Sequence, residues 1–410
     1  MLDYGYLNEG QMAIVNEAYK WFFYSNEPVF QFEGPPGTGK SVVLNFIAKT
    51  LDPDCKFSAA AAYTGAAAIV LRTKGFPMAK TLHSLLFTPV QEEICNEDGT
   101  AKTHSYFETP IYDIGFAPKP LENVKLLFID EGGMVPRWIR NEIESRGVRV
   151  VVCGDIRQLP TVDDEPGYLV DGEIFHLTEI MRQEANNAII WLSNRAIKGL
   201  PIHKGCYGNV LVIDYDELNN QMIAAADVVL CGKNSTRDEL NTRIRREILG
   251  IDDPLPKHGE RIVCRKNNWG KEINGISLAN GLIGTVTDYP DVSQFDGKTF
   301  KLDFQPNIMH GQFTNLVVDY KYFTAPYEQR KFLKNDRYAV GEKMEFAYAI
   351  TTHLSQGSEW SSGIYIQEYL NKDINNNLNY VGISRFRDYC IYVLPKKKTY
   401  YNLNRNILKK

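Results

Sequence analysis

The chain has no large excess of charge and no paired cysteines. Its 46 lysine and arginine residues stand against 50 aspartate and glutamate residues, which gives a formal net charge of −4. A chain this close to neutral has no overall field that would attract a polyanion, so any polyanion site must be a local patch. The seven cysteines include no Cys-x-x-Cys pair, which argues against a disulfide framework and against a structural zinc site.

The sequence also lacks the features of membrane and exported proteins. Its longest run of small residues, residues 59–71, is interrupted by Tyr63, Thr64 and Gly65 and is too short to cross a bilayer. Residues 1–6 have neither the cationic region nor the apolar run of a secretion signal. We therefore expect no membrane partner and a location in the reducing cytoplasm.

The chain does contain short apolar runs that alternate with helical patterns. This alternation predicts an α/β protein built on parallel sheets flanked by helices. The runs form two blocks, separated by a linker at about residues 200–208. We expect strands of the first block at residues 29–32, 124–129 and 148–152, and strands of the second block at residues 228–230, 346–350, 364–366 and 389–394.

Two segments interrupt the alternation. Residues 87–120 are polar, contain prolines and aromatic residues, and show no helical period, so we expect an inserted subdomain in the first block. Residues 257–341 are rich in Gly, Asn and Asp and contain short alternating runs. This second pattern predicts a small antiparallel β subdomain inserted into the second block.

Residues 34–41, with the sequence GPPGTGKS, match the phosphate-binding pattern G-x-x-x-x-G-K-[ST]. The motif follows an expected strand and precedes the helical run of residues 42–51, as the pattern requires. Gly37 and Gly39, with Thr38 between them, let backbone N–H groups surround phosphate oxygens. Lys40 would reach the β- and γ-phosphates of ATP, and the Ser41 hydroxyl would bind Mg²⁺.

Two further strand ends supply the groups that hydrolysis needs. Residues 126–131 (LLFIDE) form an apolar strand that delivers Asp130 to the metal ion and Glu131 to the attacking water. The strand before residue 154 leads to Gln158, whose amide would be placed to sense the γ-phosphate. A solvent-facing glutamine in a loop is the alternative interpretation of Gln158.

Taken in order, these motifs resemble those of the superfamily 1 helicases, specifically the 5′-to-3′ class that includes RecD and the bacteriophage Dda helicase. The resemblance extends over nearly the whole chain. Besides the phosphate motif, the matching segments are residues 7–11 (Q motif), 62–67 (Ia), 81–84 (Ib), 130–131 (II), 154–160 (III), 177–183 (IV), 351–360 (V) and 380–385 (VI).

The resemblance implies two RecA-like domains that hold ATP in the cleft between them. It divides the chain into domain 1A (residues 1–86 and 121–180), a wedge subdomain 1B (87–120), domain 2A (181–256 and 342–410) and an SH3-like subdomain 2B (257–341). It also implies that Gln11 reads the adenine. Arg182 and Arg385 would reach the γ-phosphate as arginine fingers, although a surface ion pair is the commoner use of an arginine.

The resemblance further implies sequence-independent contacts with DNA from short polar side chains at motif positions. These are Thr64, Thr81, His83, Thr352, His353 and Ser355. Thr81 and Ser355 fit equally well as helix N-caps.

Phe107 is expected at the tip of the wedge, where its ring would stack on a base at the duplex junction. The alternative is that Phe107 belongs to the small core of the insertion. Tyr63 and Ala66 depart from the family pattern, since Pro and Lys usually stand at these positions. The change at Ala66 removes one phosphate contact.

We therefore expect an ATP-dependent DNA helicase that moves along single-stranded DNA and opens a forked duplex. Its 5′-to-3′ direction is implied by the resemblance alone. One alternative is a translocase that displaces proteins from single strands without separating duplexes. Another is a nucleotide-gated DNA-binding module, which the presence of Glu131, Gln158 and both arginines disfavours. We expect a monomer, with single-strand-binding or replication proteins as candidate partners.

Overall fold

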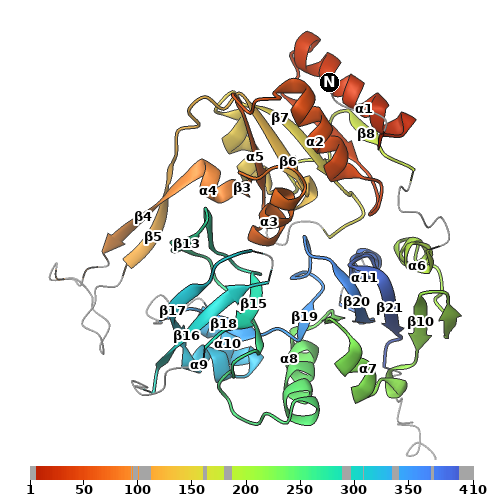
Figure 1. Ribbon diagram of the computed structural model, residues 1–410, viewed down its shortest axis with the longest axis vertical. Coiled ribbons are helices and arrows are strands. Elements are labelled where there is room, and N and C mark those ends of the chain that lie inside the picture. Colours follow the sequence, from red (N-terminus) through yellow and green to blue (C-terminus); the bar gives the residue numbers. More distant parts are fainter. Residues whose placement is uncertain are drawn as a thin grey trace, which may run out of the picture.

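Two six-stranded sheets organise the molecule, one in each half of the chain (Figure 1). The computed structural model describes residues 6–93, 95, 100, 112–159, 164–179, 187–288, 297–307, 309–334, 341–370 and 374–396. Two residues of the expected site, Phe107 and Arg182, lie outside the described residues. None of the described helices is long and apolar enough to cross a membrane.

The first sheet is parallel throughout, with the strand order β3-β2-β6-β7-β1-β8. Its strands are β1 (Val29–Glu33), β2 (Ser58–Ala62), β3 (Lys80–Thr81), β6 (Leu126–Asp130), β7 (Arg149–Gly154) and β8 (Ile174–His176). The accompanying helices are α1 (Glu9–Tyr24), α2 (Lys40–Leu51), α3 (Gly65–Thr73), α4 (Leu82–Leu86) and α5 (Arg137–Glu144). The three strands expected here are confirmed, because their continuous apolar residues suit strands that are covered on both faces.

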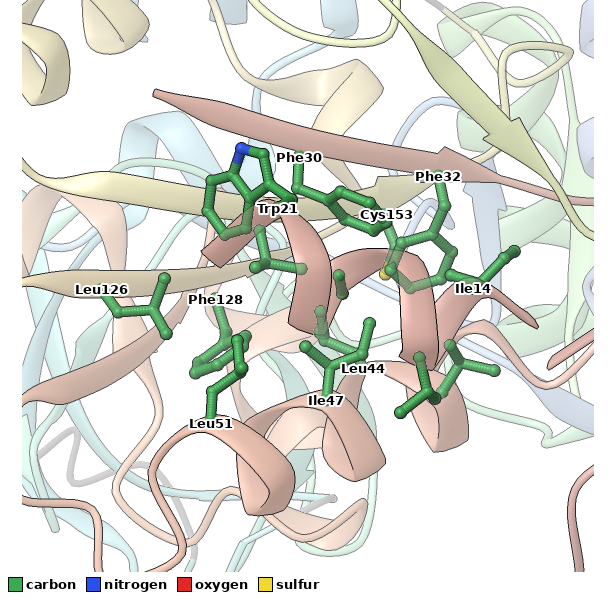
Figure 2. Packing of buried hydrophobic residues seen from close by; sticks show 14 of the residues in the cluster. Ile14, Trp21, Phe30, Phe32, Leu44, Ile47, Leu51, Leu126, Phe128 and Cys153 are labelled. Carbon is green, nitrogen blue, oxygen red and sulfur yellow. The ribbon is translucent and has the colours of Figure 1, made fainter. Parts of the chain in front are cut away.

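Aromatic and aliphatic side chains bury one face of this sheet beneath α1 and α2 (Figure 2). Phe30 and Phe32 of β1 point to the same face because alternate residues of a strand share a side. Trp21 of α1 and Leu44 of α2 pack against this face. The burial of these side chains positions the loop that joins β1 to α2.

The second sheet has the strand order β19-β11-β20-β21-β10-β9, in which β9 alone pairs antiparallel. Its strands are β9 (Gly205–Tyr207), β10 (Val210–Ile213), β11 (Val229–Cys231), β19 (Ala349–Thr351), β20 (Trp360–Ile366) and β21 (Phe386–Val393). Its α-helices are α6 (Ala188–Ile197), α7 (Asn220–Ala225), α8 (Asn234–Arg243) and α11 (Asn375–Ser384). The expected linker at residues 200–208 therefore contains an edge strand.

The first insertion includes a two-stranded antiparallel ribbon that projects from the body of the molecule (Figure 1). Strand β4 (Phe87–Glu93) pairs with β5 (Tyr112–Pro118), and Phe87 lies opposite Pro118 at the base of the ribbon.

The second insertion contains a five-stranded antiparallel sheet with the order β17-β16-β15-β12-β18. Its strands are β12 (Arg261–Cys264), β15 (Ile283–Val286), β16 (Thr299–Pro306), β17 (Phe313–Asp319) and β18 (Met344–Phe346), beside the hairpin of β13 (Asn268–Ile273) and β14 (Ile276–Leu278) and helices α9 (Tyr320–Thr324) and α10 (Tyr327–Lys334). Strand β18 lies beyond the expected boundary at residue 341, because Met344 and Phe346 pack in the core of this insertion. The single strand expected at residues 346–350 is accordingly two strands, β18 and β19.

Candidate nucleotide and DNA sites

The phosphate loop joins β1 to α2 and contains two residues in the left-handed region. The φ angles are 86° at Gly37 and 81° at Gly39, a region that favours glycine. A Cβ atom at Gly39 would lie 2.5 Å from Nε2 of Gln11, so the Gln11 side chain would have to shift if another residue stood there. Lys40 Nζ donates to the carbonyl oxygens of Gly34, at 2.8 Å, and Pro35, at 3.3 Å. The lysine predicted to bind phosphate thus folds back over its own loop.

Two hard oxygen ligands meet beside this loop. Ser41 Oγ donates a 3.0 Å hydrogen bond to Oδ2 of Asp130, at the end of β6. The other carboxylate oxygen, Oδ1, accepts from the backbone N–H of Glu131 at 2.9 Å and from the thiol of Cys153 at 3.2 Å. A hydroxyl and a carboxylate held together suit Mg²⁺, which prefers oxygen ligands, so the residues present fit the expected metal ion.

A cavity of about 660 Å³ opens between the two halves of the molecule at this point. The first half contributes Lys40, Asp130, Glu131 and Gln158 to its lining. The second half contributes residues 357–360 of motif V and Ser384 and Arg385 of motif VI, and the second insertion adds Gly281, Ile283 and Asn307. The structure therefore brings together all the described residues that the sequence assigned to hydrolysis: Lys40, Asp130, Glu131, Gln158 and Arg385.

The charged side chains around Glu131 in the cavity shift its pKa in opposite directions. Burial and the neighbouring Asp130 carboxylate raise the pKa of Glu131, and the positive charges of Arg385 and Lys40 oppose this rise. Glu131 also has a φ of 55°, an uncommon backbone conformation for a residue with a side chain. Arg385, which is 6% exposed, donates to the Ser358 carbonyl oxygen at 3.4 Å.

The Gln158 amide reaches the cavity with an unused acceptor. The residue is 8% exposed, and the described part of the chain offers no hydrogen-bond partner to its Oε1. A buried amide oxygen without a partner is costly, so a ligand or water that donates to it would be stabilised.

Gln11 does not line the cavity in this structure. Its Nε2 donates to the carbonyl oxygen of Thr38 at 2.9 Å, and its Oε1 accepts from the N–H of Asn8 at 3.1 Å. Asn8 in turn caps α1 by accepting from the Gln11 N–H, so the two residues form a capping box. The geometry gives Gln11 the role of fixing the phosphate loop, and its expected contact with adenine stays a prediction.

The second domain holds motif III through several polar contacts. Tyr380 of α11 donates a 2.5 Å hydrogen bond to Asp155, and Arg157 packs over the Tyr380 ring. Asn377 donates to the Arg157 carbonyl oxygen at 2.9 Å, and Gln356 donates to the Leu159 carbonyl oxygen at 3.1 Å. The loop that carries Gln158 is therefore attached to both halves of the molecule.

The residues expected to contact DNA fall into two groups. Thr352 and Ser355 are completely buried and donate to the carbonyl oxygens of Cys231 and Thr352. Their hydroxyl groups stabilise the turn after β19 in this structure, and their expected contact with DNA stays a prediction. Thr64 and Thr81 accept from backbone N–H groups as N-caps of α3 and α4. This confirms the cap interpretation of Thr81.

His83 lies in a group of rings that we call the aromatic cluster: His83, Phe87, Phe116, Trp138 and Trp269. His83 stacks on Trp269 of β13, with ring centroids 5.5 Å apart. Phe116 and Trp138 remain 45% and 46% exposed. The cluster joins α4, α5, the β4–β5 ribbon and the β13–β14 hairpin. Sequence analysis identified His83 but missed Trp269, which is 186 residues away in the chain and belongs to no motif.

Both motif histidines are shielded from water. Burial lowers the pKa of His83 and of His353 below the ordinary histidine value. Each imidazole is therefore neutral at pH 7, and a contact with a phosphate would be a hydrogen bond without an ion pair.

Comparisons with known proteins agree with this arrangement. Residues 6–201 match the family model described as an AAA domain. The ATP-dependent RecD2 DNA helicase of Deinococcus radiodurans is 24% identical over 384 residues, which cover 87% of this chain. The chain spans only 45% of the length of that relative.

Solved structures of Pif1 helicases have a similar fold. A Bacteroides Pif1 bound to single-stranded DNA is 19% identical, with a TM-score of 0.53 and coverage of 94% of this chain and 92% of that chain. A Pif1 helicase from Candida albicans is 19% identical, with a TM-score of 0.51 and coverage of 96% and 94%. A structure of two coordinating Pif1 helicases at forked double-stranded DNA gives 20% identity, a TM-score of 0.53 and coverage of 94% and 92%.

Proposed function

We propose that this chain, which has the two-domain fold of the RecD/Pif1-like superfamily 1 helicases, is an ATP-dependent DNA helicase. The observation that carries the proposal is the cavity between the two halves of the molecule. It has the phosphate loop and Asp130 on one side and Arg385 on the other. A triphosphate in this cavity would contact both domains, and its hydrolysis would remove that connection.

Each residue of the cavity has a separate task in this proposal. Lys40 and the loop N–H groups bind the phosphates, while Ser41 and Asp130 would hold Mg²⁺, which would supply charge that neutralises the phosphates. Glu131 orients the attacking water and accepts its proton. Gln158 senses the γ-phosphate, and Arg385 stabilises the charge of the transition state. Arg182 is proposed as a second arginine finger.

The tracking of single-stranded DNA is proposed on two supports. The Pif1 structures with similar folds include complexes with single-stranded and forked DNA. The aromatic cluster presents exposed rings at the base of the β4–β5 ribbon, and exposed rings can stack with bases without regard to sequence. We propose residues 87–120 as the wedge and residues 257–341, extended by β18, as the SH3-like subdomain. Movement is 5′-to-3′ in this proposal.

The protein is proposed to act as a monomer on single-stranded and forked DNA, with single-strand-binding or replication proteins as candidate partners. No disulfide joins any of the seven cysteines, all of which lie among the described residues, and Cys55 and Cys206 are exposed. Free exposed thiols are typical of reducing compartments, which supports the cytoplasm as the site of action.

The test is an ATPase and unwinding assay with matched DNA substrates. We expect single-stranded DNA to stimulate ATP hydrolysis, and a duplex with a 5′ tail to be unwound faster than one with a 3′ tail. The Lys40→Ala variant should lose both activities while it keeps the fold, because it removes a loop charge and no core contact.

Other outcomes identify the alternatives. Stimulated hydrolysis with no unwinding of either duplex would identify a translocase that clears proteins from single strands. Nucleotide-dependent DNA binding without hydrolysis would identify a gated binding module and would contradict the proposed helicase.

A further inference from the structure

A second lysine, Lys74, lines the cavity beside Ser41 and Asp130, the expected ligands of the metal ion, although it belongs to none of the helicase motifs. Lys74 directly follows α3, and its Nζ donates a 3.1 Å hydrogen bond to Oγ of Ser41. The same Ser41 hydroxyl donates a hydrogen bond to Asp130 at 3.0 Å, so it links Lys74 to the Asp130 carboxylate. The Lys74 ammonium group and the Asp130 carboxylate, which is expected to bind the metal ion, are therefore hydrogen-bonded to the same hydroxyl group.

The position of Lys74 follows from the periodicity of α3. Ala66, Val70 and Lys74 are spaced four residues apart, so they share one face of the helix, and all three line the cavity. Of these three, only Lys74 carries charge. The family pattern has its lysine at the position of Ala66, and this chain has a lysine two helical turns further along the same face.

Lys74 is exposed, and within the described residues Ser41 Oγ accepts the only hydrogen bond that the Lys74 side chain makes. A lysine after a helix C-terminus also interacts favourably with the helix dipole, but this effect does not require the side chain to extend toward Ser41. The flexible four-carbon stem allows the ammonium group to shift by several ångströms without disturbing the core.

We propose that Lys74 is a second triphosphate-binding lysine, which contacts the terminal phosphate of the nucleotide beside the metal ion. In phosphate-loop enzymes the metal ion bridges β- and γ-phosphate oxygens and is bound by the loop hydroxyl. A cationic group 3.1 Å from that hydroxyl is thus close to the terminal phosphate. With nucleotide bound, the Lys74 ammonium group would donate to a phosphate oxygen, and the Ser41 hydroxyl would be available to the metal ion. This inference rests on the proposed function of the cavity as an ATP site.

The proposal is tested by equilibrium binding of fluorescent ATP and ADP analogues to the full chain, in EDTA and in Mg²⁺. We expect Lys74→Met to weaken binding of the ATP analogue about tenfold, equivalent to about 1.4 kcal/mol, and to change ADP binding by less than about threefold. The loss for ATP should be larger in EDTA, where no metal ion shares the neutralisation of the phosphates. Lys74→Arg keeps the charge and should restore most of the affinity.

Lys49→Met is the matched control, because Lys49 is an exposed lysine of the adjacent helix α2 and does not line the cavity. It should bind both analogues like the wild type. Equal losses for ATP and ADP in Lys74→Met, or wild-type binding of both, would overturn the role of Lys74 while leaving the ATP site intact. Failure of the wild-type protein to bind either analogue would overturn the ATP site and this inference together.

Discussion

The Tyr380 hydroxyl donates a 2.5 Å hydrogen bond to Oδ2 of Asp155, which connects helix α11 of the second domain to motif III of the first. Asp155 Oδ1 accepts from the backbone and side chain of Arg157, so both carboxylate oxygens are engaged. Burial and the Asp155 carboxylate raise the pKa of the Tyr380 phenol, which therefore stays protonated and remains a donor. Together with the bonds from Asn377 and Gln356, this contact holds the loop bearing Gln158 against the domain that contains Arg385.

Tyr380→Phe should weaken the connection between the domains. A hydrogen bond to a charged group is worth about 2 kcal/mol, so we expect the melting temperature to fall by about 4 °C and ATP hydrolysis to fall severalfold. Calorimetry and a steady-state ATPase assay measure both effects. Tyr392→Phe is the control, because the described residues offer no partner to its buried hydroxyl. Equal effects of the two variants would contradict the role of Tyr380.

Arg385→Ala should act mainly on the chemical step. The guanidinium lies in the cavity near Glu131, and an arginine finger contributes about 10³-fold or more to the rate of phosphoryl transfer. We therefore expect kcat for ATP to fall by about 10³-fold, while ATP affinity changes only a few-fold. Single-turnover hydrolysis and nucleotide titration separate the two quantities. A collapse of affinity with unchanged kcat would identify Arg385 as a ground-state ligand.

Glu131→Gln should raise stability and lower activity. The folded-state pKa of Glu131 lies above its unfolded value of about 4.3. The folded protein therefore binds this proton more tightly, and ionised Glu131 costs folding free energy that grows as pH rises from about 4.3 through the folded-state pKa.

Without nucleotide or metal ion, Glu131→Gln should consequently melt at a higher temperature than the wild type at pH 8, with a smaller difference near pH 5. ATP hydrolysis should fall by about 10²- to 10³-fold, because the amide cannot accept a proton from water. A variant that melts below the wild type at pH 8 would show that Glu131 is stabilised as an anion.

The salt dependence of single-stranded DNA binding should not change between pH 7 and pH 8.5. His83 and His353 are neutral across this range because burial lowers their pKa values. Each phosphate that a protonated histidine neutralised would steepen the slope of log K against log salt by about 0.7. Fluorescence anisotropy at several salt concentrations measures this slope. A steeper slope at pH 7 than at pH 8.5 would show that at least one histidine contacts DNA as a cation.

Much of the candidate nucleotide site could be predicted because the sequence signals for it are local. The phosphate loop needs glycines, a lysine and a hydroxyl in eight consecutive residues, and the buried strands leading to Asp130 and Gln158 are continuous apolar runs. These features depend on backbone geometry and short-range pattern, so they can be recognised without knowledge of the remaining chain.

The contacts that depend on packing could not be predicted in the same way. Cys153 supports Asp130 through a thiol, and Trp269 stacks on His83, but neither residue type is distinctive at its position. Thr352 and Ser355 are residue types that often contact DNA phosphates, but both side chains point inward. Their hydroxyl groups donate to the carbonyl oxygens of Cys231 and Thr352. Burial is a property of the assembled fold and is only weakly encoded in a short segment.

The strand orders of the two sheets also affect how the chain folds during synthesis. The last strand of the first sheet ends at His176, whereas β21, the parallel partner of β10 in the second sheet, begins about 210 residues after His176. At about 10 residues per second, the ribosome takes about 20 s to make this interval. The first domain can fold in that time, while β10 has an unpaired edge open to wrong partners. Chaperones that bind nascent chains would therefore act mainly on the second domain.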